Sequence, residues 1–293
     1  MIGLSESGTD EMDEHDILSL ESESASQSRA ERLRRIRRIP LRFIVPNLVT
    51  LLALCLGLTS IRLASEGLYQ SAVVAIVGAA ILDGLDGRIA RALKGATRFG
   101  AELDSLADFV DFGVAPALLL YFWSLHENKN FGWFAALIFA VACALRLARF
   151  NVMIDDPKAP AWVGHFFTGM PAPAGAITVM LPMYLEFSLE TPLGGAYVPV
   201  EIGYVILIAL LMVSRIPHFS GKKIGRVPRE WFMPLLFGVM AAFLLVATFP
   251  MQMLVVLSLI YLVMIPFAVR KYRSYARNDS TMATADTPSS PAA

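Results

Sequence analysis

The sequence predicts an all-α integral membrane protein, a polytopic bundle of about eight transmembrane helices. The first observation behind this fold class is composition, since 56% of the 293 residues are hydrophobic and the mean hydropathy is +0.57. The second is the length of the apolar runs, because a helix needs about 20 apolar residues to cross a bilayer. The third is that basic residues alternate between successive loops, which is typical of a chain that crosses a membrane repeatedly.

Successive apolar segments of sufficient length follow one another along the chain. The predicted spans are 43–64, 71–91, 101–123, 131–150, 169–187, 197–214, 231–249 and 251–269. The last two are separated only at Pro250, so their division is the least distinct. Pro173 and Pro182 lie in the fifth span and should kink it or displace its start, because proline removes a helical hydrogen bond.

Arginine and lysine gather on one side of this arrangement. They precede the first span and follow the second, fourth, sixth and eighth, whereas the opposite loops contain only Arg62 and Lys129. The positive-inside rule then puts both termini and the loop around Gly95 in the cytoplasm. The expected location is the cytoplasmic membrane, as a multi-pass protein. An odd number of spans would break this alternation.

The polar segments lie at the two ends of the chain and between spans. Residues 1–28 are rich in Ser, Glu and Asp and lack aromatic residues, so they are expected to be disordered. The other predicted divisions are a basic juxtamembrane segment at 29–42, a transmembrane core at 43–214, a basic cytoplasmic loop at 215–230, two additional spans within 231–270 and a second disordered tail at 271–293.

Four aspartates bracket the loop between the second and third spans. Asp83 and Asp86 are three residues apart, and Asp104 and Asp108 are four apart, so each pair lies on one face of a helix. A chain that folds back at Gly95 brings both pairs to one depth, roughly 13 Å from the tip. Carboxylates this close repel unless cations bind, and hard divalent cations take oxygen ligands. The sequence therefore predicts a metal site built from all four.

The aspartates belong to a longer pattern that spans 26 residues. It reads Asp83-x-x-Asp86-Gly87-x-x-Ala90-Arg91, then eight residues, then Gly100-x-x-x-Asp104-x-x-x-Asp108. This pattern resembles the signature of the CDP-alcohol phosphotransferase family at every defining position. The resemblance implies a six-helix transmembrane core in which the aspartates hold one or two divalent ions, Mg²⁺ or Mn²⁺. It also implies that Asp108 acts as the general base.

A further set of residues is predicted to bind the CDP-linked lipid. The set is Asn47, Thr50, Gly87, Arg91, Arg98 and Gly100. The two glycines would let nucleotide or neighbouring backbone approach closely. The two arginines lie symmetrically about the loop and can contact phosphate, although Arg98 would serve equally well to anchor the loop. Asn47 and Thr50 share a helix face and can hydrogen-bond cytidine or phosphate, or else only pack between helices.

Several other segments are similar to the phosphatidylserine synthase branch of this family, namely 46–50, 57–61, 111–116, 146–151, 167–173 and 211–214. The similarity implies transfer of a phosphatidyl group from CDP-diacylglycerol to L-serine, with release of CMP. It also implies a homodimer surrounded by membrane lipids, without a nucleic-acid partner. Arg146, Arg149 and Asn151 would bind the acceptor. The arginines can instead only set the orientation in the membrane and extend their charged ends to its surface. Asn151 can instead cap a helix.

Other functions stay open on the sequence. Another member of the family would use glycerol 3-phosphate, inositol phosphate or choline as the acceptor. A transporter would use the aspartates as an ion relay, and would place carboxylates near the bilayer midplane in two related halves. A salt-bridge cluster of Asp83 and Asp86 with nearby arginines, or a noncatalytic scaffold, would need no metal. Asp111 lies outside the signature and either touches substrate or faces the bundle interior.

Overall fold

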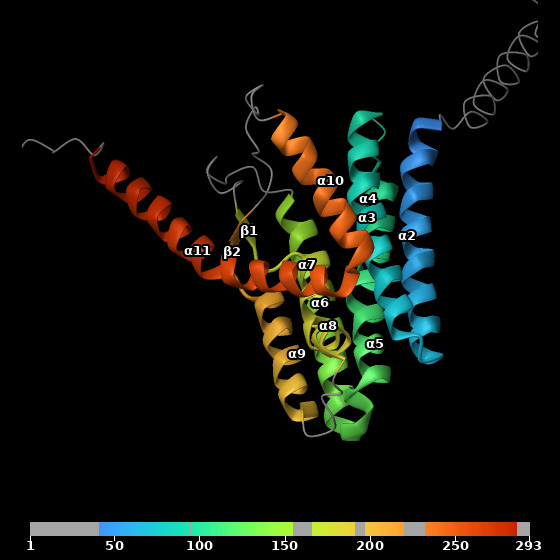
Figure 1. The fold of residues 1–293 in the computed structure, drawn as a ribbon. Coiled ribbons are helices and arrows are strands. Elements are labelled where there is room, and N and C mark those ends of the chain that lie inside the picture. The colour runs from blue at the N-terminus through green and yellow to red at the C-terminus, as the bar shows by residue number, and fades with distance from the viewer. Residues whose placement is uncertain are drawn as a thin grey trace, which may run out of the picture.

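The computed structural model describes residues 41–93, 95, 97–154, 166–190, 197–219 and 232–285. Predictions for residues 1–28, for most of 29–42 and for 220–230 lie outside this described part. The helices in it are α2 (Leu41–Ser65), α3 (Tyr69–Ala92), α4 (Arg98–Phe109), α5 (Ala115–Trp123), α6 (Lys129–Ile154), α7 (Ala172–Val179), α8 (Leu181–Leu189), α9 (Val198–Val213), α10 (Phe232–Thr248) and α11 (Pro250–Ala285), as Figure 1 shows. The predicted all-α class is confirmed.

Four short elements in the described part of the chain interrupt or join these helices. A π-helical turn at Val110–Val114 joins α4 to α5, and a 3₁₀ turn at Leu125–Asn128 leads into α6. Strands β1 (Phe166–Thr168) and β2 (Pro217–Phe219) pair antiparallel, with Phe167 opposite His218. This small ribbon links the chain after α6 to the chain after α9, and the hydropathy pattern did not indicate it.

Five helical stretches in the described part of the chain are long and apolar enough to cross a membrane. They are Ile44–Ser65, Arg98–Trp123, Leu125–Val152, Ala172–Leu189 and Pro250–Tyr272, and they overlap the first, third, fourth, fifth and eighth predicted spans. The second, sixth and seventh predicted spans are also helical, as α3, α9 and α10. The helices α9 and α10 are shorter, with 16 and 17 residues, and α3 carries the charged residues of the signature. The chain is an integral membrane protein.

Pro182 divides the fifth predicted span, in agreement with the sequence. Helix α7 ends at Val179 and α8 begins at Leu181, so Pro182 occupies the first turn of α8, where its missing N–H costs no hydrogen bond. Just before α7, Gly169 has φ of 81°. A side chain there would also meet the carbonyl oxygens of Met212 and Ser214 at 2.8 Å. Glycine is therefore required for this close approach to the end of α9.

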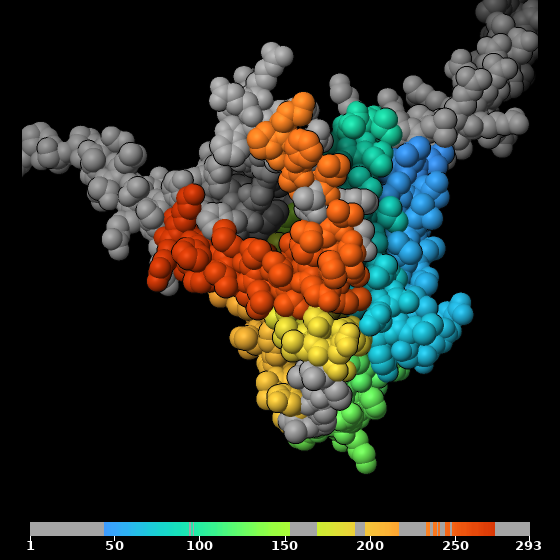
Figure 2. Space-filling model, in the orientation of Figure 1, coloured from blue at the N-terminus to red at the C-terminus, as the bar shows by residue number. Residues whose placement is uncertain are grey.

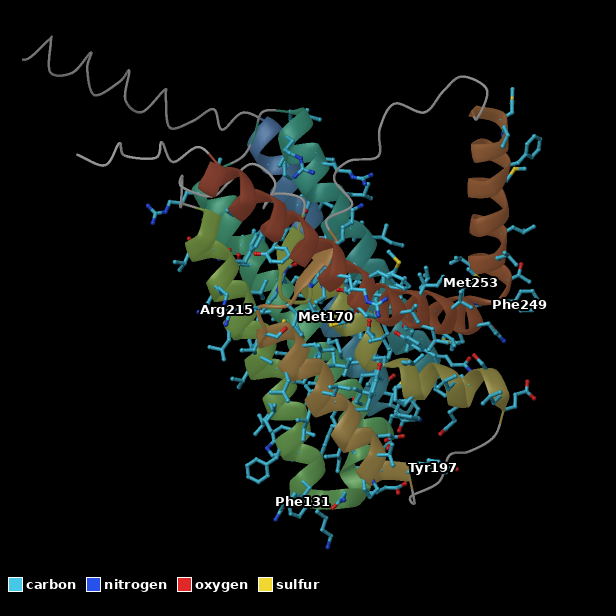
Figure 3. All side chains as sticks on the ribbon, turned by 90° about the vertical axis from the view of Figure 1, so that its left-hand side faces the viewer. Phe131, Met170, Tyr197, Arg215, Phe249 and Met253 are labelled. Atoms are coloured by element: carbon cyan, nitrogen blue, oxygen red, sulfur yellow. The ribbon has the colours of Figure 1, made fainter. Side chains whose placement is uncertain are left out.

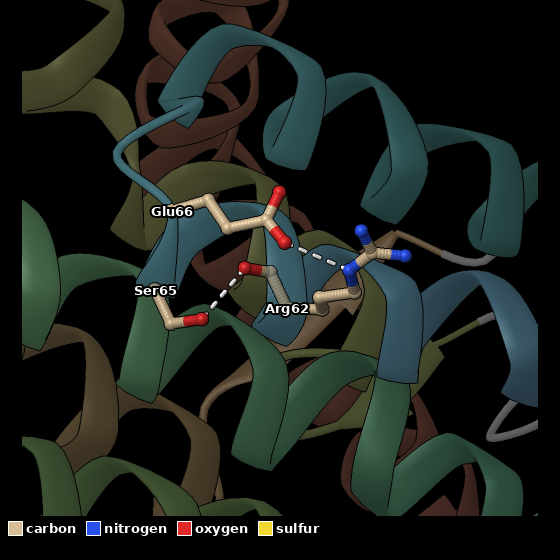
Figure 4. A network of polar contacts seen from close by, with 3 residues as sticks. All are labelled: Arg62, Ser65 and Glu66. Atoms are coloured by element: carbon tan, nitrogen blue, oxygen red, sulfur yellow. Dashed lines mark hydrogen bonds and ion pairs between the residues drawn. The ribbon is translucent and has the colours of Figure 1, made fainter.

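The loop after α2 is closed by local polar contacts, which Figure 4 shows. Arg62 Nε donates to Glu66 Oε1 at 2.8 Å, and Ser65 Oγ donates to the carbonyl of Arg62 at 2.7 Å. The two charged side chains are 75% and 42% exposed, so the pair contributes at most about 1 kcal/mol. The pair therefore adds little to the stability of the fold.

Helix α11 differs most from the sequence expectation. It has 36 residues, continues through Pro266 and includes residues 271–285, where the sequence predicts a disordered tail. Those residues contain neither glycine nor proline, so nothing in the local sequence ends the helix. Figure 1 shows α11 running across the bundle, at a steep angle to α5 and α9. The last predicted span is thus one part of a longer crossing helix.

Candidate active site

Three of the four signature aspartates come together between α3 and α4. Asp83, Asp104 and Asp108 each offer a carboxylate oxygen, and these oxygens lie within 4.8 Å of one another. The chain reversal between α3 and α4 makes the cluster, as the sequence predicts. All three side chains are partly exposed, so the cluster is accessible from outside the core.

The donor set suits a hard divalent cation. Oxygen ligands of one Mg²⁺ lie at most about 4.2 Å apart, twice the ion–oxygen distance. The cluster of Asp83, Asp104 and Asp108 therefore needs only a small contraction to enclose an ion. Carboxylates without a cation in this arrangement would repel one another. The residues present fit a divalent metal, which these three aspartates would hold.

Asp86 lies apart from this cluster and is held by α2. It is 4% exposed, and its Oδ2 accepts a hydrogen bond of 2.6 Å from the hydroxyl of Thr50. The same hydroxyl lies 3.2 Å from the carbonyl oxygen of Pro46. Two residues that the sequence assigns to different ligands, Thr50 to nucleotide and Asp86 to metal, are therefore in direct contact. A metal role for Asp86 stays a prediction.

If Asp86 is a metal ligand, as the sequence predicts, Thr50→Val should weaken Mn²⁺ binding about tenfold or more, because removing a group that orients a ligating carboxylate typically costs 10- to 100-fold in affinity. The substitution removes the donor to Asp86 and leaves a buried carboxylate oxygen without it. The measurement is a Mn²⁺ titration of the purified protein followed by electron paramagnetic resonance. Thr59→Val is the matched control, because the Thr59 hydroxyl bonds only the Cys55 carbonyl of the same helix. Equal affinities for the two variants would contradict the expectation.

The start of α4 is built by a cap that the sequence analysis missed. Thr97 is extended and accepts a hydrogen bond of 3.0 Å from the backbone N–H of Gly100. A threonine directly before a helical run is an N-cap signal that was available in the sequence. A Cβ at Gly100 would lie 2.8 Å from Asn47 Oδ1. The glycine therefore lets α2 approach α4, and it brings two predicted nucleotide-binding residues together.

Arg91 of the signature and the nearby Arg98 lie on either side of the turn that joins α3 to α4. Arg91 is exposed in the last turn of α3, and Arg98 is exposed at the first residue of α4. A Cβ at Gly87 would lie 3.6 Å from Arg91 Nη1, so the guanidinium folds back over that glycine. Contact of these two arginines with phosphate stays a prediction.

The predicted acceptor-binding residues separate into two groups. Arg146 lies in electrostatic range of Asp108 and Asp83, and its guanidinium is 5.5 Å from the ring centroid of Phe150. Arg149 instead donates from Nη1 to the carbonyl of Val213 at 2.6 Å, which ties α6 to α9. Asn151 donates to Ser105 Oγ at 2.9 Å, which ties α6 to α4. Of these three predicted residues, Arg146 is the one with an electrostatic interaction with the aspartates.

Asp111 lies one turn beyond Asp108, inside the π-helical turn. It is 1% exposed, and a Cβ at Gly57 would collide with its carboxylate, so it packs directly against α2. The structure therefore places Asp111 in the bundle interior, the second of the two alternatives from the sequence. A π-helical turn is frequent beside functional sites, and here it shifts the helical register between the aspartates and α5.

The fold and the site together define a class of protein. It is a helical membrane protein with a carboxylate cluster suited to a divalent cation. Comparison with known proteins then gives the family. The model of the CDP-alcohol phosphatidyltransferase family matches residues 43–214, which contain every residue of the site described above. The chain belongs to this family.

Several relatives cover most of the chain. The protein from Mycobacterium leprae is 42% identical over 235 residues, which are 78% of this chain and 76% of the relative. The protein from Mycobacterium tuberculosis strain H37Rv is 41% identical, covering 80% of this chain and 81% of the relative. The protein from Helicobacter pylori strain J99 is 36% identical, covering 75% and 89%. All three relatives are named CDP-diacylglycerol–serine O-phosphatidyltransferase.

Proposed function

We propose that this protein is a CDP-diacylglycerol–serine O-phosphatidyltransferase, which moves the phosphatidyl group from CDP-diacylglycerol to the hydroxyl of L-serine. The products are phosphatidylserine and CMP. The observation that carries the proposal is the cluster of Asp83, Asp104 and Asp108 beside Arg146, within the part of the chain that matches the family. The names of relatives that are 36% to 42% identical support serine as the acceptor.

In the proposed reaction the serine hydroxyl attacks the phosphorus that carries diacylglycerol. A new phosphorus–oxygen bond forms, the bond to the CMP oxygen breaks, and CMP leaves with the bonding electron pair. Asp108 accepts the hydroxyl proton, which a positioned carboxylate can do as general base. A divalent cation, Mg²⁺ or Mn²⁺, would neutralise the negative charge on the pyrophosphate and on the departing CMP.

The remaining site residues are proposed to position the two substrates. Arg91 and Arg98 would contact phosphate from the turn between α3 and α4. Asn47, beside Gly100, would contact the cytidine. Arg146 would bind the carboxylate of serine, because guanidinium pairs with carboxylate in a bidentate geometry. Arg149 and Asn151 would support Arg146. Their contacts with α9 and α4 fix the end of α6 that carries Arg146.

The proposal includes orientation and assembly. Both termini and the aspartate hairpin would face the cytoplasm, because the basic residues gather on that side of the predicted spans. A homodimer in the cytoplasmic membrane, surrounded by membrane lipids, is proposed from the resemblance to the family.

The decisive experiment measures CMP release from CDP-diacylglycerol by the purified protein. We expect release that needs L-serine, proceeds in Mn²⁺ or Mg²⁺ and stops in EDTA, because the aspartate cluster cannot hold charged phosphates without a cation. Release only with glycerol 3-phosphate, inositol phosphate or choline would refute serine as the acceptor. Substrate flux in proteoliposomes without CMP release would refute the enzyme and favour a transporter.

A further inference from the structure

A polar contact joins the helix that carries two of the clustered aspartates to the helix that carries Arg146. The side-chain amide of Asn151 in α6 donates from Nδ2 to Ser105 Oγ in α4 at 2.9 Å. Both side chains are partly exposed, so a ligand can reach them. Ser105 directly follows Asp104 and precedes Asp108 by three residues. The contact therefore lies within one helical turn of the carboxylate cluster.

Arg146 and Asp108 interact electrostatically across the same two helices. Figure 1 shows the chain running down through α4 and α5 and returning upward through α6, so α4 and α6 are antiparallel. Ser105 lies one turn before Asp108, and Asn151 lies in the last turn of α6, after Arg146. Figure 3 shows Phe131, near the other end of α6, at one end of the bundle. The interactions of Arg146 and Asn151 with α4 are therefore successive contacts along one helix pair.

The hydrogen bonds of Ser105 decide which way the amide of Asn151 is turned. A serine hydroxyl has one proton, and Ser105 Oγ donates it to the backbone carbonyl of Ala101 at 3.1 Å. Asn151 Oδ1 is the more distant acceptor for this proton, at 3.4 Å. Ser105 Oγ is then an acceptor toward the amide, which suits the NH₂ group at 2.9 Å. This arrangement leaves the carbonyl oxygen of Asn151 able to accept a hydrogen bond from a ligand.

The carbonyl oxygen of Asn151 restricts the chemistry of that ligand. An amide oxygen only accepts hydrogen bonds, so it attracts an ammonium N–H and disfavours a phosphate oxygen. The ammonium of L-serine offers three N–H donors, as the ammonium of lysine does. Glycerol 3-phosphate and inositol phosphate bring a phosphate instead, and the quaternary nitrogen of choline has no N–H. Among these acceptors, L-serine is the one that matches Asn151.

We propose that Ser105 is a positioning residue for the acceptor, acting through the amide of Asn151. Its hydroxyl oxygen holds the NH₂ group of Asn151, so that the amide carbonyl accepts a hydrogen bond from the ammonium of L-serine. The pair thereby selects an acceptor with an N–H donor over one with a second phosphate. This inference rests on the proposed function, since it assumes L-serine as the acceptor.

The test compares Ser105→Ala with the wild-type protein. Formation of phosphatidylserine is measured while L-serine and CDP-diacylglycerol are varied separately, and 3-hydroxypropanoate, which is serine without its amino group, is added as a competitor. We expect KM for L-serine to rise about threefold to tenfold, the effect of one hydrogen bond. KM for CDP-diacylglycerol and the inhibition constant of 3-hydroxypropanoate should stay within about twofold, because neither compound carries the ammonium that Asn151 would bind.

Ser105→Thr and Ser65→Ala are the controls. Threonine keeps a hydroxyl that can bond the carbonyl one turn earlier in a helix, so KM for L-serine should stay within about twofold of wild type. Ser65 ends α2, and its hydroxyl donates to the carbonyl of Arg62 at 2.7 Å. Figure 2 shows the turn after α2, in light blue, far from the teal start of α4 at the top of the molecule. Ser65→Ala should therefore leave KM for L-serine unchanged.

A double-mutant cycle with Asn151→Ala tests whether Ser105 acts through the amide. In that background Ser105→Ala should change KM for L-serine less than about twofold, because the group that Ser105 orients is gone. An unchanged KM for L-serine in Ser105→Ala would overturn the inference. An equal rise of this KM and of the inhibition constant of 3-hydroxypropanoate would overturn it too. A wild-type protein that forms no phosphatidylserine would refute the proposed function, and the inference would fall with it.

Discussion

Asp108→Asn is expected to lower serine-dependent CMP release by at least about a hundredfold, the lower end of what a general base contributes. Asparagine keeps the size and shape of the side chain but cannot accept the proton of the serine hydroxyl. Asp83 and Asp104 remain in place, so the variant should still bind CDP-diacylglycerol and a divalent cation. The measurements are the rate of CMP release at saturating substrates and equilibrium binding of labelled CDP-diacylglycerol.

Glu102→Gln is the control for this substitution. It removes the same charge from the same helix, but Glu102 is exposed and lies outside the aspartate cluster. We expect its turnover to stay within about twofold of wild type, since surface substitutions have small effects. Near-normal turnover of Asp108→Asn, with lipid binding retained, would show that another group accepts the proton.

The aspartate cluster could be predicted because its geometry is local. Two helical pairs and a short reversal are enough to place Asp83 near Asp104 and Asp108, and both the spacing and the loop are readable in the chain. The separate position of Asp86 could not be predicted from the sequence. It involves a hydrogen bond from the hydroxyl of Thr50, which lies 36 residues away on α2. Contacts between distant helices depend on how the bundle packs, and hydropathy does not report that packing.

Other parts of the structure differ from the prediction because hydropathy does not report how helices pack or where irregular turns occur. The π-helical turn at Val110–Val114 lies inside the long helical stretch Arg98–Trp123, and no break in the sequence marks it. Helix α11 continues past the predicted end of its span, because residues 271–285 contain neither glycine nor proline. The contact of Arg149 with the carbonyl of Val213 follows from how α6 and α9 cross, and its role at the acceptor stays a prediction. Hydropathy locates the helices but does not predict how they cross one another.

Asp104→Asn is expected to raise the Mn²⁺ concentration for half-maximal activity at least about tenfold, because a neutral amide replaces one of three clustered carboxylates. Turnover in low Mn²⁺ should fall more steeply than turnover in high Mn²⁺, since mass action restores occupancy of a weakened site. The measurement is CMP release over a range of Mn²⁺ concentrations, again with Glu102→Gln as the control.

The Asp104 and Asp108 variants together distinguish a metal ligand from a base. Added Mn²⁺ should recover much of the activity of Asp104→Asn, because the proton acceptor is still present. The same addition should recover little of the activity of Asp108→Asn, because occupancy of the metal site does not replace a missing base. Full recovery of both variants would make Asp108 a ligand only, whereas recovery of neither would place Asp104 in the chemical step. The two carboxylates lie one helical turn apart, so different metal responses would reflect chemical role and not position.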